Sequence, residues 1–171
     1  VAIMTKPIKC KHGTCIYCPG GPSSVFGDIP QSYTGKEPAT RRAIRNKFDP
    51  YLQVFNRLEH YTLLNQSPEK VELIIMGGTF PSFPKDYKEE FIKYALKALN
   101  DFSNLFYKKE LDFSKFKKFF ELPGNVKDIE RTEKIHEKLL RLKKETSLER
   151  EQRRNEKSRI RCVAMCLETR P

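Results

Sequence analysis

The apolar run at residues 71–76, VELIIM, constrains the fold of this chain more than any other feature. It is rich in β-branched residues, nearly uninterrupted and closed by Gly77 and Gly78, as is typical of a strand buried on both faces. Such strands occur in parallel sheets whose faces are covered by helices. The run therefore predicts an α/β fold and requires more strands and helices elsewhere in the chain.

The flanking segments supply those elements in alternation. Apolar residues 1–4 and 160–167 predict two further strands, whereas residues 19–38 are rich in Gly, Pro and Ser and predict a loop. A helix should start at Asp49 and Pro50, a good capping pair, and a second one should start at Pro84. This order favours right-handed βαβ units and a parallel sheet. Three strands cannot close a barrel, so we expect a fragment of a longer protein.

A charged segment interrupts this rhythm between the second helix and the third strand. Phe and Lys come first, and alternating charges with a narrow apolar stripe follow, which predicts a long exposed helix or a helical hairpin. The predicted organisation is thus strand and cysteine loop at 1–47, helix-strand-helix at 48–101, charged helical insertion at 102–157 and third strand at 158–171.

Three cysteines lie within nine residues directly after the first strand. Cys10, Cys15 and Cys18 have CxxxxCxxC spacing, and the odd total of five cysteines without an export signal argues against a disulfide framework. Three thiolates can bind three irons of a [4Fe-4S] cluster and leave the fourth open. S-adenosylmethionine can chelate that open iron, and an electron from the cluster can then cleave it to a deoxyadenosyl radical. The spacing therefore predicts a [4Fe-4S] cluster with S-adenosylmethionine.

A zinc site is the alternative for these cysteines. His12 or another cysteine would then complete a closed set of four ligands, although zinc sites usually contain paired CxxC knuckles and this chain has only one. Cys162 and Cys166 lie inside an apolar strand, so we expect them to be buried core residues.

Candidate cofactor contacts follow the second strand. Gly77, Gly78 and Thr79 could bind the amino acid end of S-adenosylmethionine, since glycine lets a backbone approach a ligand closely. An ordinary turn is the alternative. Tyr17, between two of the cysteines, could pack against the cluster or the adenine, or serve as a core aromatic residue.

The net charge of +11 makes a polyanion the expected large partner. Residues 1–47 carry eight basic and two acidic side chains, so the excess surrounds the cysteines. A generally solvated basic surface is the alternative. No membrane span or signal peptide is recognisable, so we expect a cytoplasmic protein. The candidate contacts to RNA or DNA phosphates are Lys6, Lys9, Arg41, Arg42 and Arg45.

The motifs CxxxxCIYCPGGP, QSYTGKEP, DPYLQ, MGGTF and ETRP occur here in one order. With them the chain resembles the radical S-adenosylmethionine domain of the catalytic subunit of Elongator, in an archaeal-like stand-alone form. The resemblance covers residues 1–101 and 158–171. It implies the N-terminal part of a partial TIM-like barrel, interrupted by a charged helical insertion, and a tRNA-modifying transferase of the acyltransferase class.

The resemblance also implies a reaction. The deoxyadenosyl radical removes hydrogen from the methyl group of acetyl-CoA, the carbon radical adds to C5 of the wobble uridine of tRNA, and thioester hydrolysis gives carboxymethyluridine. By position, the three cysteines resemble the cluster ligands and residues 77–79 the cofactor contacts. Lys70 matches a lysine that binds acetyl-CoA in the family.

Departures from the family limit what this chain should do alone. The acetyltransferase-type domain and the N-terminal tRNA-binding segment are absent, and residues 102–157 are longer and more charged than the family pattern. We therefore expect the 171 residues to be incompetent for the whole reaction. A zinc-stabilised RNA-binding module, or a radical enzyme with another substrate, are the competing hypotheses. The sequence leaves open which tRNAs are modified, the electron donor and the need for partner subunits.

Overall fold

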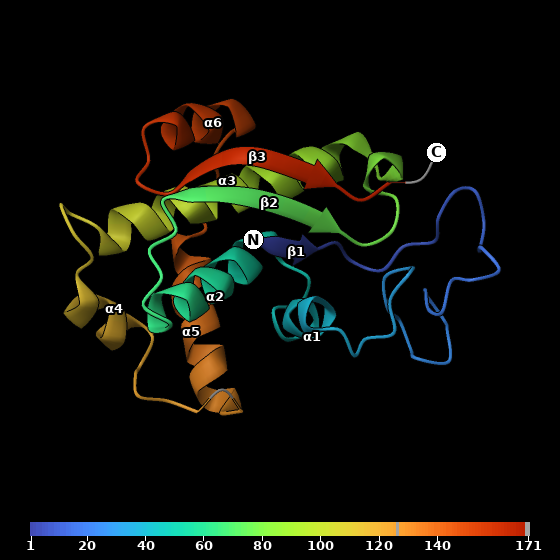
Figure 1. The fold of residues 1–171 in the computed structure, drawn as a ribbon, viewed down its shortest axis with the longest axis horizontal. Coiled ribbons are helices and arrows are strands. Elements are labelled where there is room, and N and C mark those ends of the chain that lie inside the picture. The colour runs from blue at the N-terminus through green and yellow to red at the C-terminus, as the bar shows by residue number, and fades with distance from the viewer. Residues whose placement is uncertain (126, 170–171) are drawn as a thin grey trace.

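The computed structural model describes residues 1–125 and 127–169, which contain a three-stranded parallel sheet (Figure 1). Its strands are β1 (Ala2–Met4), β2 (Lys70–Met76) and β3 (Arg161–Leu167), in the order β1-β2-β3. Ile3 pairs with Ile75 in β2, and Leu73 pairs with Met165 in β3. The predicted parallel sheet of alternating strands and helices is confirmed.

Several helices begin at a capping side chain. Asp49 accepts a hydrogen bond from the Leu52 amide at 3.1 Å and starts the second helix, as its Asp-Pro pair predicts. No helix of the described residues is both long and apolar enough to span a membrane. The helices are α1 (Pro38–Arg45), α2 (Pro50–Leu63), α3 (Lys85–Phe106), α4 (Phe113–Phe119), α5 (Ile129–Leu142) and α6 (Leu148–Glu156), with a 3-10 turn, η1 (Phe80–Ser82).

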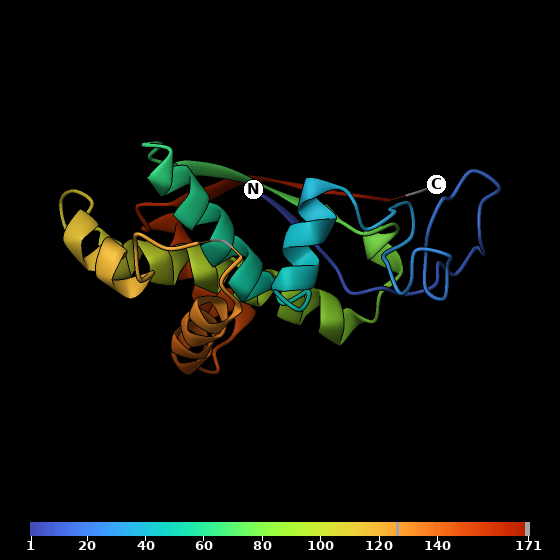
Figure 2. The ribbon, with the colours of Figure 1, turned by 90° about the horizontal axis from the view of Figure 1, so that it is seen from below.

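The sheet is covered on one side. In Figure 2 the sheet lies nearly edge-on, with most of the helical mass on one side of it. Val71, Leu73 and Ile75 of β2 are buried against that side, whereas Glu72 and Ile74 are exposed. The prediction that β2 is buried on both faces is therefore wrong, because no described element packs on the second face.

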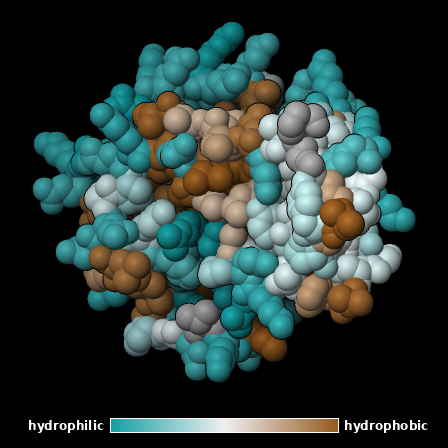
Figure 3. Space-filling view, turned by 45° about the vertical axis from the view of Figure 1, so that its right-hand side comes forward, coloured by the Kyte–Doolittle hydropathy of each residue, from teal (hydrophilic) through white to brown (hydrophobic). Residues whose placement is uncertain are grey.

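The strand β3 also has a more open environment than the sequence suggests. Cys162 is half-buried and Cys166 is exposed, so the expectation of two buried core cysteines is wrong. Both belong to the edge strand of the described sheet, whose apolar side chains Val163, Met165 and Leu167 remain partly exposed. Figure 3 shows hydrophobic surface in this region bordered by hydrophilic side chains.

The hydrophobic core extends into the predicted insertion. Helix α3 continues through residue 102 to Phe106, across the predicted segment boundary. Phe102 and Phe106 pack edge-to-face with ring centroids 4.8 Å apart, and Phe116 and Phe120 of the next segment join them. All four are fully buried, so the first part of residues 102–157 completes the core.

The charged part of the insertion forms two separate helices. Ser147 accepts a hydrogen bond from the Arg150 amide at 3.2 Å and starts α6 after a break that follows α5. Helix α6 packs against α3, while Arg131 of α5 pairs with Glu59 of α2 at 3.0 Å. Figure 1 shows α5 and α6 on opposite sides of α3, so neither a single long helix nor a hairpin forms.

Candidate functional site

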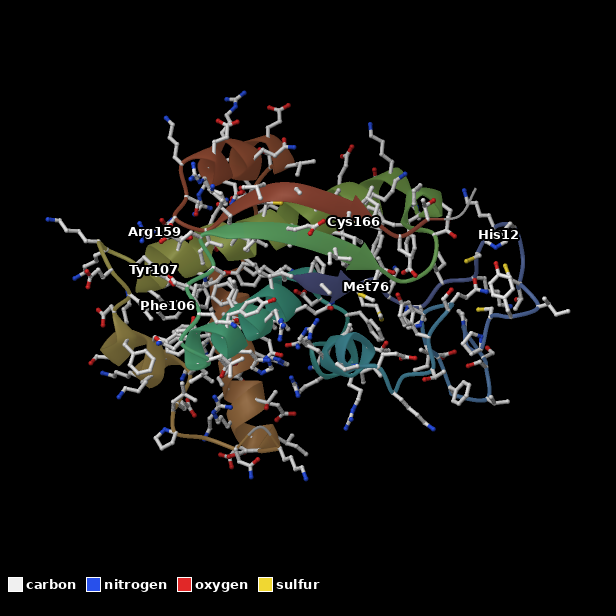
Figure 4. All side chains as sticks on the ribbon, viewed as in Figure 1. His12, Met76, Phe106, Tyr107, Arg159 and Cys166 are labelled. Atoms are coloured by element: carbon white, nitrogen blue, oxygen red, sulfur yellow. The ribbon has the colours of Figure 1, made fainter. Side chains whose placement is uncertain are left out.

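The segments that follow the three strands meet in one pocket. Because the carboxyl ends of parallel strands lie at the same edge of a sheet, the loops after β1, β2 and β3 converge there. Figure 4 shows His12 beyond that edge, Met76 on β2 and Arg159 toward the opposite end of the sheet. The pocket is lined by Cys10, His12, Cys15, Tyr17, Cys18, Gln31, Ser32, Gly78, Thr79, Glu168 and Thr169.

All three loop cysteines are outside any disulfide of the described residues, are partly buried and line this pocket. The Cys10 sulfur lies 3.6 Å from the Thr79 hydroxyl, which links the cysteine loop to the segment after β2. Cys18 donates to the Gly20 carbonyl at 2.9 Å and accepts from the Ser32 amide at 3.1 Å. The structure therefore places the three thiols at one pocket, and their role as cluster ligands stays a prediction.

The donor set of this pocket can be compared with the ligands that an iron–sulfur cluster and a single zinc ion require. Among the described residues no three His, Cys, Asp or Glu side chains are gathered closely enough to hold one metal ion. A zinc ion needs all its sulfur ligands at about 2.3 Å from one centre, whereas a [4Fe-4S] cluster takes one thiolate per iron. Cys10, Cys15 and Cys18, which line one pocket, offer the three thiolates that such a cluster takes when its fourth iron is left open. His12, whose Nε2 is 3.2 Å from the Cys15 sulfur, is the side chain that a zinc site would recruit.

Glu168 joins the ends of β2 and β3. Its Oε2 accepts hydrogen bonds from the amides of Gly77 at 2.6 Å and Gly78 at 3.0 Å. Positive φ angles of 125° at Gly77 and 94° at Gly78 accompany this arrangement. The Tyr33 hydroxyl donates to the same carboxylate at 3.0 Å. Burial, and then the Glu168 charge, raise the Tyr33 pKa, so this phenol remains a donor at neutral pH.

Glu168 and Tyr33 lie in sequence motifs, but the sequence alone predicts no role for either. A usable signal existed for Glu168, because the residue after a parallel strand lies at the same edge as the glycines after its neighbour. Gln31 was also missed. Its buried side chain accepts a hydrogen bond from the Cys10 amide, a contact between loop residues that no local pattern reveals.

Gly77 is expected to tolerate no side chain. An alanine Cβ there would collide with the buried Thr5 side chain and would also need a positive φ. We expect Gly77→Ala to lower the free energy of unfolding by about 3 kcal/mol, measured by urea denaturation. Gly27→Ala is the matched control, since Gly27 has a φ of 85° but open space around it, and should cost about 1 kcal/mol. Equal losses would show that the collision with Thr5 contributes nothing.

The predicted nucleic-acid contacts divide into two groups. Lys6 and Lys9 are exposed on the segment between β1 and the cysteines, with the Lys6 ammonium 4.8 Å from the Tyr87 ring centroid. The arginines lie on α1 and do not line the cysteine pocket. Arg41 is exposed, whereas Arg42 is buried and donates to the Ala2 carbonyl at 2.6 Å.

Of the remaining predicted site residues, Tyr17 lies at the cysteine pocket and Lys70 lies far from it. Tyr17 lines the pocket while its side chain stays 69% exposed. Lys70 is the first residue of β2, about 20 Å along the strand from Met76 at ~3.3 Å per residue. The structure therefore does not bring Lys70 to the cysteines. Arg170 and Pro171 of the ETRP motif lie outside the described residues.

Comparisons with known proteins identify relatives for the whole chain. It is 42% identical over 171 residues to the tRNA uridine(34) acetyltransferase of Methanocaldococcus infernus, covering 100% of this chain and 24% of that protein. It is 49% identical over 108 residues to Elongator complex protein 3 of Saccharomyces cerevisiae, covering 60% of this chain and 19% of that one. No family model matches the chain.

A solved structure of a relative resembles this fold. The archaeal Methanocaldococcus infernus Elp3 with an N-terminal deletion aligns with a TM-score of 0.50 and 32% identity, covering 75% of this chain and 21% of that chain. The present chain thus spans about a quarter or less of the length of the relatives that it matches.

Proposed function

The chain is a homologue of a segment of the tRNA uridine(34) acetyltransferase and Elongator complex protein 3 family, and we propose that it contains the cofactor site of a radical S-adenosylmethionine enzyme that modifies the wobble uridine of tRNA. The observation that carries this proposal is the pocket in which the three cysteine side chains meet the segments after β2 and β3. Homology supports tRNA modification, and the thiols support the cofactor.

The pocket residues have distinct proposed roles. Cys10, Cys15 and Cys18 would hold a [4Fe-4S] cluster, which supplies the electron that cleaves S-adenosylmethionine. The backbone at Gly77 and Gly78 and the Thr79 hydroxyl would bind the amino acid end of the cofactor.

Two further side chains suit the same cofactor. Glu168 provides a fixed carboxylate suited to the cofactor's ammonium group, because two amides and the Tyr33 hydroxyl hold it in place. Tyr17, with an exposed ring at the pocket, would stack on the adenine and limit access of water.

The complete reaction requires more than these residues. We infer that the full protein is a transferase that uses acetyl-CoA to carboxymethylate C5 of the wobble uridine, acting in the cytoplasm. The rest of its own polypeptide would supply the remaining barrel strands and the acetyltransferase domain. Lys70 would contact acetyl-CoA. The exposed Lys6, Lys9 and Arg41, with Arg42 and Arg45, would contact tRNA phosphates.

Dependence on substrates tests this proposal. The full-length protein, reconstituted anaerobically with iron and sulfide and reduced with dithionite, is expected to form 5'-deoxyadenosine from S-adenosylmethionine only when both tRNA and acetyl-CoA are present. Chromatography of the quenched reaction measures the product, with tRNA or acetyl-CoA omitted singly as controls. Equal formation without tRNA and acetyl-CoA would instead indicate a radical enzyme with another substrate.

One observation favours a second candidate. The contact of 3.2 Å between His12 Nε2 and the Cys15 sulfur would suit a zinc-stabilised RNA-binding module without catalysis. In that case His12 is a metal ligand, whereas an open-iron cluster requires only the three thiolates.

A further inference from the structure

Residues 31–33 contact each of the segments that form the cysteine pocket. Gln31 and Ser32 line this pocket, although they lie 21 and 14 positions along the chain from the cysteines that they contact. On the basis of the proposed [4Fe-4S] function, we propose that Gln31 is a positioning residue for the cluster. It fixes the Cys10 backbone directly and, through the Ser32 amide, raises the reduction potential of the cluster.

The hydrogen bond to Cys10 determines how the Gln31 side chain is oriented. A backbone amide can only donate, so the Gln31 atom that faces the Cys10 amide is the acceptor Oε1. Gln31 is only 5% exposed. A side-chain carbon placed on Gly78 would lie 3.5 Å from the Cys10 sulfur and 3.6 Å from the Gln31 Cβ. Gln31, Cys10 and the segment after β2 therefore pack together, which restrains the Cys10 backbone.

The next residue contacts a second sulfur. The Ser32 amide donates to the Cys18 sulfur at 3.1 Å. The φ of Ser32 is 76°, a left-handed conformation that a non-glycine residue keeps only when its neighbours hold it. The Cys18 thiol also donates to the Gly20 carbonyl at 2.9 Å. A thiolate ligand of iron has no proton to donate, so of these two contacts the Ser32 amide is the one that remains.

A hydrogen-bond donor at this sulfur affects how easily the cluster is reduced. Reduction adds negative charge to an iron–sulfur cluster, and an N–H group directed at a ligand sulfur stabilises that charge. The Ser32 amide therefore favours the reduced state. Because Ser32 directly follows Gln31 in the chain, loss of the hydrogen bond between Gln31 and Cys10 is expected to displace this amide.

The other end of the segment is fixed independently. The Tyr33 hydroxyl donates to the Glu168 carboxylate at 3.0 Å, and the Tyr33 amide donates to the Pro30 carbonyl at 3.2 Å. Tyr33 is thus held by the segment after β3, and Gln31 is held by Cys10. The Ser32 amide is restrained from both sides, so removal of one restraint should change the geometry at Cys18 and leave the other contacts in place.

The reduction potential of the cluster tests this assignment. The full-length protein is reconstituted anaerobically with iron and sulfide, and its potential is measured by a redox titration followed by electron paramagnetic resonance. Gln31→Met nearly keeps the side-chain volume but removes the acceptor. At a fixed solution potential, the ratio of reduced to oxidised cluster should fall about tenfold, a shift of ~59 mV to lower potential, because the donor to Cys18 is displaced.

Gln53→Met is the matched control. Gln53 is fully buried, accepts from the Met4 amide at 2.8 Å and donates to the Met4 carbonyl at 2.9 Å, but it does not line the cysteine pocket. The same substitution there should lower the free energy of unfolding and leave the reduction potential unchanged. An equal shift of the potential in both variants, or no shift in Gln31→Met, would overturn the role of Gln31.

Hydrogen exchange of the apoprotein gives a second measurement, with fragmentation mass spectrometry resolving the Cys10 amide. This amide should exchange about tenfold faster in Gln31→Met than in the unmodified protein. Gln31→Glu keeps an acceptor of the same reach and should restore slow exchange. Unchanged exchange in Gln31→Met, or fast exchange in Gln31→Glu, would contradict the positioning of Cys10 by Gln31.

The two measurements separate failure of this inference from failure of the proposed function. Absence of a cluster in the unmodified protein would refute the proposed function, and with it the role of Gln31 in cluster reduction. A cluster that assembles normally, with a potential independent of Gln31, would refute this inference alone.

Discussion

Replacement of Cys15 by alanine is expected to abolish assembly of the iron–sulfur cluster. Each thiolate of the proposed cluster binds a different iron, so loss of one ligand exposes a second iron and leaves the cluster unsupported. Anaerobic reconstitution with iron and sulfide should give the unmodified protein a broad visible absorption and bound iron. Cys15→Ala should remain colourless, with iron at background level by elemental analysis.

Two control variants make this measurement specific. Cys166→Ala removes an exposed thiol from β3, outside the pocket, and should assemble the cluster normally. His12→Ala removes the side chain nearest to the Cys15 sulfur. It should also retain the cluster, because an open-iron site needs only three protein ligands. Stoichiometric zinc in a colourless protein, lost in His12→Ala, would falsify the radical-enzyme proposal and favour the zinc module.

Local signals explain which elements the sequence predicts correctly. Asp49 and Pro50 determine where α2 begins because both act within one helical turn. The exposure of Ile74, in contrast, is not predicted by local signals. Its apolar side chain in a β-branched run favours burial on both faces, yet its exposure depends on which distant segments cover the sheet. Side-chain hydrophobicity alone carries no information about that covering.

In the candidate site too, some residues are predicted by a local pattern, whereas the contacts of others depend on the tertiary structure. Three cysteines within nine residues are a local pattern, and the structure brings them to one pocket. Glu168 contacts Gly77 across 91 positions, so its fixed carboxylate emerges only when β2 and β3 pair. Arg42 was predicted from its charge as a surface contact, but the packing of α1 against β1 buries it. Its unpartnered Nε is therefore a property of the tertiary structure.

A buried ionic network attaches α6 of the insertion to α3. Glu151 is fully buried, and its carboxylate accepts from Arg154 at 2.7 and 2.9 Å and from Asn100 at 2.9 Å. Arg154 also donates to Asp101 at 2.9 Å. One guanidinium therefore bridges two carboxylates that belong to different helices, and it compensates the cost of burying them.

Arg154→Met is expected to lower the free energy of unfolding by about 3 kcal/mol, because it leaves the Glu151 charge buried without its cation. Arg153→Met is the matched control on the same helix. Arg153 is 80% exposed and 3.8 Å from Glu149, so its loss should cost about 0.5 kcal/mol or less in the same urea titration. Similar losses in both variants would mean that the buried network contributes no more than a surface pair.

The consequence of Arg154→Met should extend to the cysteine pocket. Asn155, the next residue of α6, accepts from the Cys162 amide at 2.7 Å and donates to the Ile160 carbonyl at 3.1 Å, so α6 holds the start of β3. The end of β3 carries Glu168. If the network orders this strand, hydrogen exchange of the β3 amides should accelerate in Arg154→Met but not in Arg153→Met. Unchanged exchange of the β3 amides in both variants would show that the network in the insertion does not stabilise β3 or the pocket at its end.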